Sequence, residues 1–107
     1  MRPIVLTATG VEAVAARVNY RQQDFKIGFG VDLDSTGTFT VYHTFDDPAD
    51  FNGHSDWVST ATWFPNGDSA LTAGTANADG NYMFPVQGIK LDATVNASTI
   101  KITILQA

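Results

Sequence analysis

Hydrophobic and polar residues alternate along most of this chain, and this period of two predicts strands. Residues 24–34 show the clearest alternation, with apolar side chains at Phe25, Ile27, Phe29, Val31 and Leu33. Residues 38–45 repeat the pattern, with Phe39, Val41, His43 and Phe45 on one face and mainly threonine on the other. Because successive side chains of a strand point to opposite faces, each run has one face suited to a hydrophobic core. The threonine face of 38–45 is typical of a solvated sheet surface.

Turn sequences connect these runs in pairs. Asp-Ser-Thr-Gly at 34–37 joins the first two runs, so we expect a hairpin over 24–45 at the centre of a sheet. Residues 88–95 and 99–106 also alternate, and Asn-Ala-Ser lies between them. The sequence therefore predicts a second hairpin over 88–106.

Three shorter segments complete the expected strands. Residues 3–8 form a short apolar run, and residues 82–86 form another, in which Pro85 predicts an edge position or a bulge. Residues 11–18 fit a helix or a strand equally by spacing. We interpret 11–18 as a strand, with Val14, Ala16 and Val18 on one face, because its neighbours are strands.

The middle of the chain, residues 46–81, is rich in small polar residues and turn signals. It also carries aromatic residues at Phe51, Trp57, Trp63 and Phe64. Because loops carry most binding residues, this segment is where we expect a binding surface. In so small a core at least one tryptophan packs inside, and we expect Trp63 and Phe64 in the core with Trp57 at the rim or in an interface.

These patterns predict an all-β fold: a single-domain β-sandwich or jelly roll over 1–107, with about seven to eight antiparallel strands. The chain has 107 residues, which is the size of one domain. Glycine and threonine are frequent and glutamate occurs once, a composition that favours strands and turns over helices.

Charge and cysteine content exclude several classes of function. Six basic residues face eleven acidic ones, giving a net charge of -5. Nucleic-acid binding needs clustered lysine and arginine, so nucleic acid is not an expected partner. The chain has no cysteine, which excludes disulfides and cysteine-ligated zinc. It also lacks a signal-peptide pattern and an apolar run of the ~20 residues that a membrane helix needs, so we expect synthesis in the cytoplasm and no membrane partner.

Asp46, Asp47 and Asp50 surround Pro48 where the 38–45 strand ends. Carboxylate oxygens are ligands that calcium prefers, but the spacing differs from that of a preformed calcium loop. Aspartate at a corner also accepts hydrogen bonds from backbone N–H groups, and we interpret the cluster in that way. The sequence leaves calcium binding at this corner open.

Neither histidine belongs to a catalytic pattern. His43 shares a strand face with apolar residues and is expected to be a partly buried, aromatic-like side chain, whereas His54 is expected on the loop surface. His54, Ser55 and Asp56 are adjacent in sequence and so cannot fold onto one another as a triad. We predict no catalytic, cofactor-binding or metal-ligating residue and no cofactor.

Several stretches resemble short virion proteins of tailed bacteriophages and prophages. The resemblance rests on YHTFDDPADF, on TWF and on TANADGNYMFPVQGIKLDATVNASTIKITILQA, and it covers roughly residues 24–107. It implies a capsid decoration or cement protein of jelly-roll type, located on the capsid exterior and made in the host cytoplasm. The implied partner is the major capsid protein, whose subunits it would bridge, and the implied assembly is a dimer or trimer on capsid symmetry axes. For the Asp-Asp-Pro stretch the resemblance implies a structural corner.

Two other classes of function remain as alternatives. A carbohydrate-binding β-sandwich of a head fibre or tail would use Trp57, the tyrosines and the acidic loop as its sugar surface. A small hydrolase would depend on Asp47 or His54.

Overall fold

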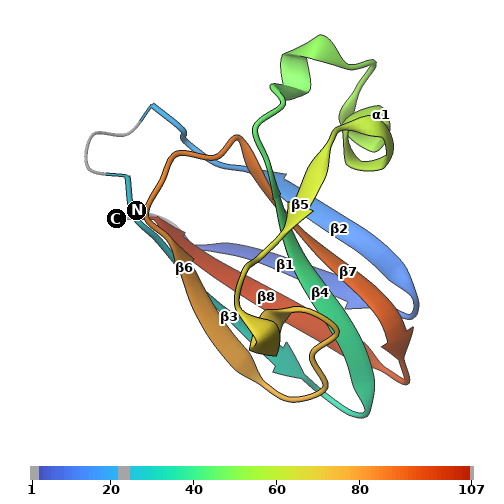
Figure 1. The fold of residues 1–107 in the computed structure, drawn as a ribbon. Coiled ribbons are helices and arrows are strands. Elements are labelled where there is room, and N and C mark those ends of the chain that lie inside the picture. The colour runs from blue at the N-terminus through green and yellow to red at the C-terminus, as the bar shows by residue number, and fades with distance from the viewer. Residues whose placement is uncertain (1–2, 22–24, 107) are drawn as a thin grey trace.

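The computed structural model describes residues 3–21 and 25–106, and residue 24, the expected start of the third strand, lies outside them. Within these residues the chain forms eight strands, one short α-helix and two 3-10 turns (Figure 1). The elements are β1 Ile4–Thr9, β2 Glu12–Arg17, β3 Ile27–Leu33, β4 Gly37–Thr44, η1 Pro48–Asp50, α1 His54–Thr60, β5 Trp63–Pro65, η2 Ser69–Leu71, β6 Ala78–Tyr82, β7 Gly88–Asn96 and β8 Thr99–Gln106.

The strands form two four-stranded antiparallel sheets. Sheet A has the order β1-β8-β3-β6, and sheet B has the order β2-β7-β4-β5. One set of pairs is that of a single long hairpin: β1–β8, β2–β7, β3–β6 and β4–β5. Two further pairs, β3–β8 and β4–β7, arise because this hairpin is wound into two sheets. This is the jelly-roll arrangement, so the predicted all-β sandwich is confirmed.

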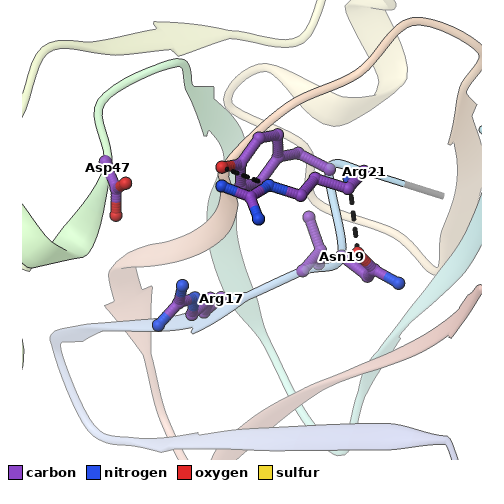
Figure 2. A pocket seen from close by; sticks show the side chains of 6 residues that line it. Arg17, Asn19, Arg21 and Asp47 are labelled. Atoms are coloured by element: carbon purple, nitrogen blue, oxygen red, sulfur yellow. Dashed lines mark hydrogen bonds between the residues drawn. The ribbon is translucent and has the colours of Figure 1, made fainter.

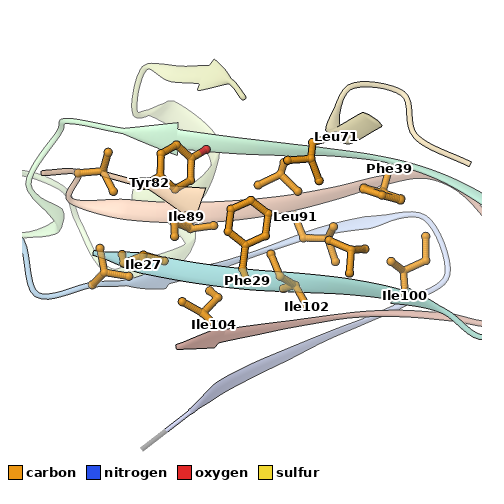
Figure 3. Close-up of a cluster of buried hydrophobic side chains, with 14 of the residues drawn as sticks. Ile27, Phe29, Phe39, Leu71, Tyr82, Ile89, Leu91, Ile100, Ile102 and Ile104 are labelled. Atoms are coloured by element: carbon orange, nitrogen blue, oxygen red, sulfur yellow. The ribbon is translucent and has the colours of Figure 1, made fainter. Parts of the chain in front are cut away.

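The hydrophobic core fills the space between the sheets (Figure 3). Alternating positions of β3 and β8 face alternating positions of β4 and β7, and Leu71 of η2 adds a further apolar side chain. The buried side chains include Ile27, Phe29, Phe39, Val41, Ile89, Leu91, Ile100, Ile102 and Ile104. The apolar faces that the sequence predicted for these four strands are therefore the buried ones.

Both predicted hairpins are wrong, although all four of their strands are present. β3 pairs with β6 and β8, whereas β4 pairs with β5 and β7, so the connection between β3 and β4 crosses from one sheet to the other. β7 and β8 likewise lie in different sheets. The alternation determines which face of a strand is buried but not which strand lies beside it.

The two crossing connections are hydrogen-bonded to each other, which explains why neither forms a hairpin turn. Asp34 N donates to Thr99 O at 3.1 Å, and Ala97 N donates to Thr36 O at 3.1 Å. The Ser98 hydroxyl also donates to the Asp34 carboxylate at 3.0 Å. Backbone groups that a hairpin turn would pair locally are thus satisfied by the neighbouring connection.

The strand predicted at 82–86 is also wrong, because the structure places β6 at Ala78–Tyr82 instead. The sequence Asp79-Gly80 looked like a turn signal, yet both residues lie within β6. A Cβ atom at Gly80 would come within 3.0 Å of the Leu71 and Phe29 side chains. Glycine is present there to leave room for core side chains rather than to make a turn.

The N-terminal strand predictions are confirmed. Residues 3–8 correspond to β1, and the ambiguous segment 11–18 contains β2. Val14 and Ala16 of β2 pack against the core between the sheets, while Ala15 on the other face packs beneath α1.

The segment 46–81 is more regular than predicted and covers part of the outer face of sheet B. The side chain of Trp57 in α1 is fully buried against Ala15 and Ala61, whereas Trp63 is half-buried and Phe64 is exposed. The expected placement of Trp63 and Phe64 in the core and of Trp57 at the rim is therefore wrong, because Trp57 is the buried residue of the three. The expected solvated threonine face of β4 is also partly wrong, because this segment buries Thr40 and Thr44.

The close packing of Trp57 on sheet B predicts a sharp difference between two glycines. A Cβ atom at Gly88 would lie under 3.0 Å from the Trp57 ring, whereas one at Gly28 would have nothing within 4 Å. We expect Gly88→Ala to lower the free energy of unfolding by about 1–3 kcal/mol through overpacking. Gly28→Ala should leave it unchanged or raise it by about 0.5 kcal/mol. Urea unfolding of both variants measures the difference, and equal stabilities would contradict the placement of Trp57.

Candidate functional site

The largest group of exposed aromatic residues lies at the sandwich edge formed by β5 and β6. We call it the aromatic patch and define it as Phe45, Phe64 and Phe84, which are 52%, 45% and 47% exposed. Neighbouring rings are in contact, with centroid distances of 5.8 Å between Phe45 and Phe64 and 6.1 Å between Phe45 and Phe84. An apolar group of this kind on a small acidic protein marks an interaction surface.

The patch is a continuation of the interior face of sheet B. Phe45 follows β4 at the next inward-facing position after His43, and the strand register places His43 opposite Phe64 of β5. Phe84 lies two residues after the end of β6 in the other sheet and contacts Tyr82. β6 of the facing sheet ends at Tyr82, which packs on His43, so no strand of sheet A covers the next inward-facing position. The alternation predicted Phe45 to be buried, and the structure exposes it for this reason.

Beneath the patch, His43 and Tyr82 form a buried polar pair. His43 is 8% exposed and its Nδ1 lies 3.0 Å from the Tyr82 hydroxyl oxygen. The His43 ring also packs edge-on against Phe45 and Phe84, with centroids 5.5 Å apart in both cases. The predicted aromatic-like burial of His43 is confirmed, and these contacts hold the exposed rings in fixed positions.

Both members of this pair are uncharged at neutral pH. Burial lowers the pKa of His43 from its ordinary value of 6.5. Burial also raises the pKa of Tyr82 to about 12. The base of the patch therefore adds no charge to its apolar surface.

A second candidate surface is the free edge of β1. Among the strands of residues 3–21 and 25–106, β1 pairs with β8 alone, so its other edge presents backbone groups outside the sheet ladder. Its sequence, Ile-Val-Leu-Thr-Ala-Thr, contains no charged residue and no proline. Natural edge strands are usually protected from pairing by charges, proline or a very short length. The other edge strands carry such protection: Glu12 and Arg17 in β2, Pro65 in β5 and Asp79 in β6.

At the acidic corner, Asp46 and Asp47 accept hydrogen bonds from backbone N–H groups, as the sequence indicated. Asp47 accepts a hydrogen bond from Ala49 N at 2.9 Å and so caps η1. Asp46 accepts one from Thr62 N at 2.8 Å, and its backbone carbonyl accepts one from the Trp57 indole at 3.1 Å. Asp50 lies exposed at the end of η1. Within residues 3–21 and 25–106, no three histidine or acidic side chains are grouped to hold a metal ion.

His54, Ser55 and Asp56, the adjacent residues considered as a triad, lie in the first turn of helix α1. His54 is exposed as expected, but it begins a helix rather than lying in a loop, and its ring contacts Trp57. Asp56 accepts hydrogen bonds from Asn52 N at 3.0 Å and from the Thr60 hydroxyl at 3.2 Å. The Asp56 contacts support the helix.

An open hollow of about 430 Å³ lies between β2 and the acidic corner (Figure 2). Arg21 donates from Nε to the Tyr20 hydroxyl at 2.8 Å, and its backbone N–H donates to the Asn19 side chain at 3.3 Å. Arg17 and Asp47 also line the hollow. Because positive and negative side chains face the same exposed space, we assign no ligand to it.

Lys90 lies between two aromatic rings on the outer face of sheet B. Its ammonium nitrogen is 4.9 Å from the centre of the Tyr42 ring and 4.8 Å from that of Trp63. Burial lowers the pKa of Lys90, while Asp92 opposes this effect. These cation–π contacts fix the half-buried Trp63 against the sheet.

No protein-family model matches the chain, and neither a curated protein nor a solved structure matches it. Among the helices of the described residues, none is long and apolar enough to cross a membrane.

Because burial lowers the pKa of His43, the stability of the protein should depend on pH. Below about pH 6.5 the unfolded chain binds a proton at His43 that the folded protein resists, so the free energy of unfolding should fall as the pH is lowered. His43→Phe should remove this part of the slope, which urea unfolding between pH 7 and 5 measures. The matched control His54→Gln changes an exposed histidine and should keep the wild-type slope. A slope that is identical in wild type and His43→Phe would contradict the buried neutral imidazole.

Proposed function

We propose that this protein is a non-enzymatic capsid decoration protein of a tailed bacteriophage, which binds the outside of the shell and bridges major capsid subunits. The partner and the location on the virion exterior come from the sequence resemblance. The jelly-roll fold and the nature of the exposed surfaces support the same role, because they provide for docking.

The observation that carries the proposal is the unprotected edge of β1. An extended segment of another protein can add to such an edge as a further strand, with main-chain hydrogen bonds providing affinity and side-chain contacts providing specificity. Val5 is 54% exposed on the outer face of β1, where it would contact the added strand. An extended arm of a capsid subunit is the partner that suits this edge.

Decoration of a shell does not require a large contact for each copy. A single β1 edge of six residues offers a small interface, and such contacts are weak when isolated. On a capsid the same site is repeated many times, so copies that are joined to one another bind with a combined affinity far above that of one site.

The other function classes have less support in the geometry. The carbohydrate hypothesis used Trp57 as a stacking platform, but Trp57 is 0% exposed. Trp63 is packed against Lys90 and Trp57. The hydrolase hypothesis used Asp47 and His54, which cap η1 and contact Trp57 respectively.

A charge placed on the β1 edge should weaken capsid binding. We expect Val5→Lys to weaken co-sedimentation with undecorated capsids roughly tenfold, which corresponds to about 1.4 kcal/mol, because lysine on an edge strand opposes strand addition. Leu105→Lys is the matched control: Leu105 is 55% exposed on the same face of sheet A, but it lies on the interior strand β8. It should bind like the wild type.

Two results would contradict the proposal. Wild-type protein that stays in the supernatant with capsids of its own phage would remove the decoration role. Equal losses of binding in Val5→Lys and Leu105→Lys would keep the role but remove the β1 edge as the contact. Thermal unfolding of each variant confirms that it is folded before binding is compared.

A further inference from the structure

We propose that Asn52 and Gly53 form a site of spontaneous deamidation, at which Asn52 is converted to aspartate and isoaspartate and helix α1 is loosened. This inference goes beyond the proposed function and does not depend on capsid binding. The chain contains two Asn-Gly sequences, at 52–53 and at 66–67. Asparagine before glycine is prone to this reaction, because glycine has no Cβ atom to keep its backbone nitrogen away from the asparagine side chain.

The reaction uses only the chain itself and water. The backbone nitrogen of Gly53 attacks the Cγ carbon of Asn52 and forms a bond to it. The side-chain nitrogen of Asn52 leaves as ammonia, together with the proton that Gly53 gives up, and a five-membered succinimide ring remains. Water then opens this ring at either of its two carbonyl carbons, which gives an ordinary aspartate or an isoaspartate. In both products a neutral amide has become a carboxylate.

The structure leaves the Asn52 side chain free to react. Asn52 and Gly53 are both exposed, in the bend that precedes α1. Gly53 has a φ of 96°, a conformation that glycine adopts without strain. Among the hydrogen bonds of the described residues, Asn52 takes part through its backbone N–H, which donates to the Asp56 carboxylate at 3.0 Å, and not through its side chain. The side-chain amide can therefore turn toward the Gly53 nitrogen without breaking a hydrogen bond of its own.

The same sequence at 66–67 is held in place. The Asn66 side-chain oxygen accepts a hydrogen bond from Asp68 N at 2.9 Å. The Asn66 backbone N–H donates to Val41 O at 2.8 Å, and its carbonyl accepts from the Thr72 hydroxyl at 3.1 Å. Asn66 is also half-buried. Because Asn66 must leave its side-chain bond before it can react, we expect it to deamidate more slowly than Asn52.

Isoaspartate at position 52 would disturb the start of α1. Its main chain runs through the former side-chain carbon, so one CH₂ group is added directly before Gly53. The Gly53 carbonyl accepts the hydrogen bond from Trp57 N at 3.1 Å that begins the helix. A helix of seven residues is not stable alone, and α1 depends on the burial of Trp57 against sheet B. A displaced Gly53 therefore weakens the attachment of α1 to the sheet.

The converted fraction should increase with the age of the protein, because the reaction needs no partner. Each conversion also adds one negative charge to a chain whose net charge is -5. Charge thus provides a way to separate converted protein from fresh protein.

Peptide mass spectrometry of protein aged at pH 8 tests the site. In the folded protein, conversion at Asn52 should be at least severalfold faster than conversion at Asn66. In guanidinium chloride, where neither side chain is held, the two rates should become similar. The comparison separates the effect of the structure from that of the Asn-Gly sequence, which both sites share.

Two variants form a matched pair. Asn52→Gln removes the reactive residue, because glutamine would have to close a six-membered ring, and the Asn52 side chain makes no hydrogen bond among the described residues that this change would break. Isoelectric focusing should show acidic forms accumulating in aged wild type and in aged Asn66→Gln, with a severalfold loss of these forms in aged Asn52→Gln. Thermal unfolding of fresh protein confirms that each variant is folded.

The loosening of α1 has its own readout. Anion exchange isolates the acidic forms of aged protein, and the isoaspartate form should unfold several degrees below fresh protein. Its tryptophan fluorescence should shift to longer wavelength, because Trp57 is 0% exposed in the intact fold and would meet water. Asn52→Asp carries the same added charge on an ordinary backbone and should unfold close to the wild-type temperature.

Three outcomes would overturn the inference. The first is equal conversion of Asn52 and Asn66 in the folded protein. The second is accumulation of acidic forms in Asn52→Gln at the wild-type rate. The third is an isoaspartate form that unfolds at the same temperature as Asn52→Asp, because α1 would then be unaffected by the lengthened backbone.

Discussion

The interior faces of β3 and β8 in sheet A pack against those of β4 and β7 in sheet B, and this contact determines where the other elements lie. All four strands carry their apolar residues on one face, so the two sheets can bury them only against each other. Each connection between consecutive described strands then crosses from one sheet to the other, except the one from β4 to β5, which are paired in sheet B. The bonds from Asp34 N to Thr99 O and from Ala97 N to Thr36 O continue the β3–β8 and β4–β7 pairings into the connections after β3 and β7.

The candidate docking surfaces follow from the limits of this packing. On one side of the sandwich, β6 of sheet A ends at Tyr82, and the inward-facing positions of Phe45 and Phe64 emerge into solvent there. On the other side, β1 ends sheet A without a charge or a proline to prevent pairing. The buried polar pair of His43 and Tyr82 marks the boundary between the core and the exposed aromatic side chains. The exposed side chains of Phe45 and Phe64 therefore continue the apolar layer that forms the core.

The sequence predicted strands and buried faces well because both depend on a local period of two. Ile27, Phe29 and Val31 are buried as their alternation indicated. Pairing could not be predicted in this way, because the turn at 34–37 permits both a hairpin and a crossing between sheets. Gly80 suggested a turn, but it lies in a strand. Glycine is needed there because a Cβ atom would collide with the side chains of Phe29 and Leu71.

The docking surfaces were the hardest part to predict. The apolar pattern of 38–45 continues to Phe45 without a break. This residue is exposed because β6 of the facing sheet, which comes much later in the chain, ends at Tyr82. α1 was missed for a related reason, since its seven residues have little apolar periodicity and depend on burying Trp57 against sheet B. Only tertiary packing distinguishes these residues from the loops around them.

Nuclear Overhauser contacts between backbone protons of neighbouring strands test the central claim that β3 and β4, although consecutive in the chain, lie in opposite sheets. The structure predicts cross-strand contacts between Phe29 and Ile104 and between Val41 and Leu91, which are directly paired in the two sheets. Contacts between β3 and β4 in a regular hairpin register, with none between β3 and β8, would contradict it.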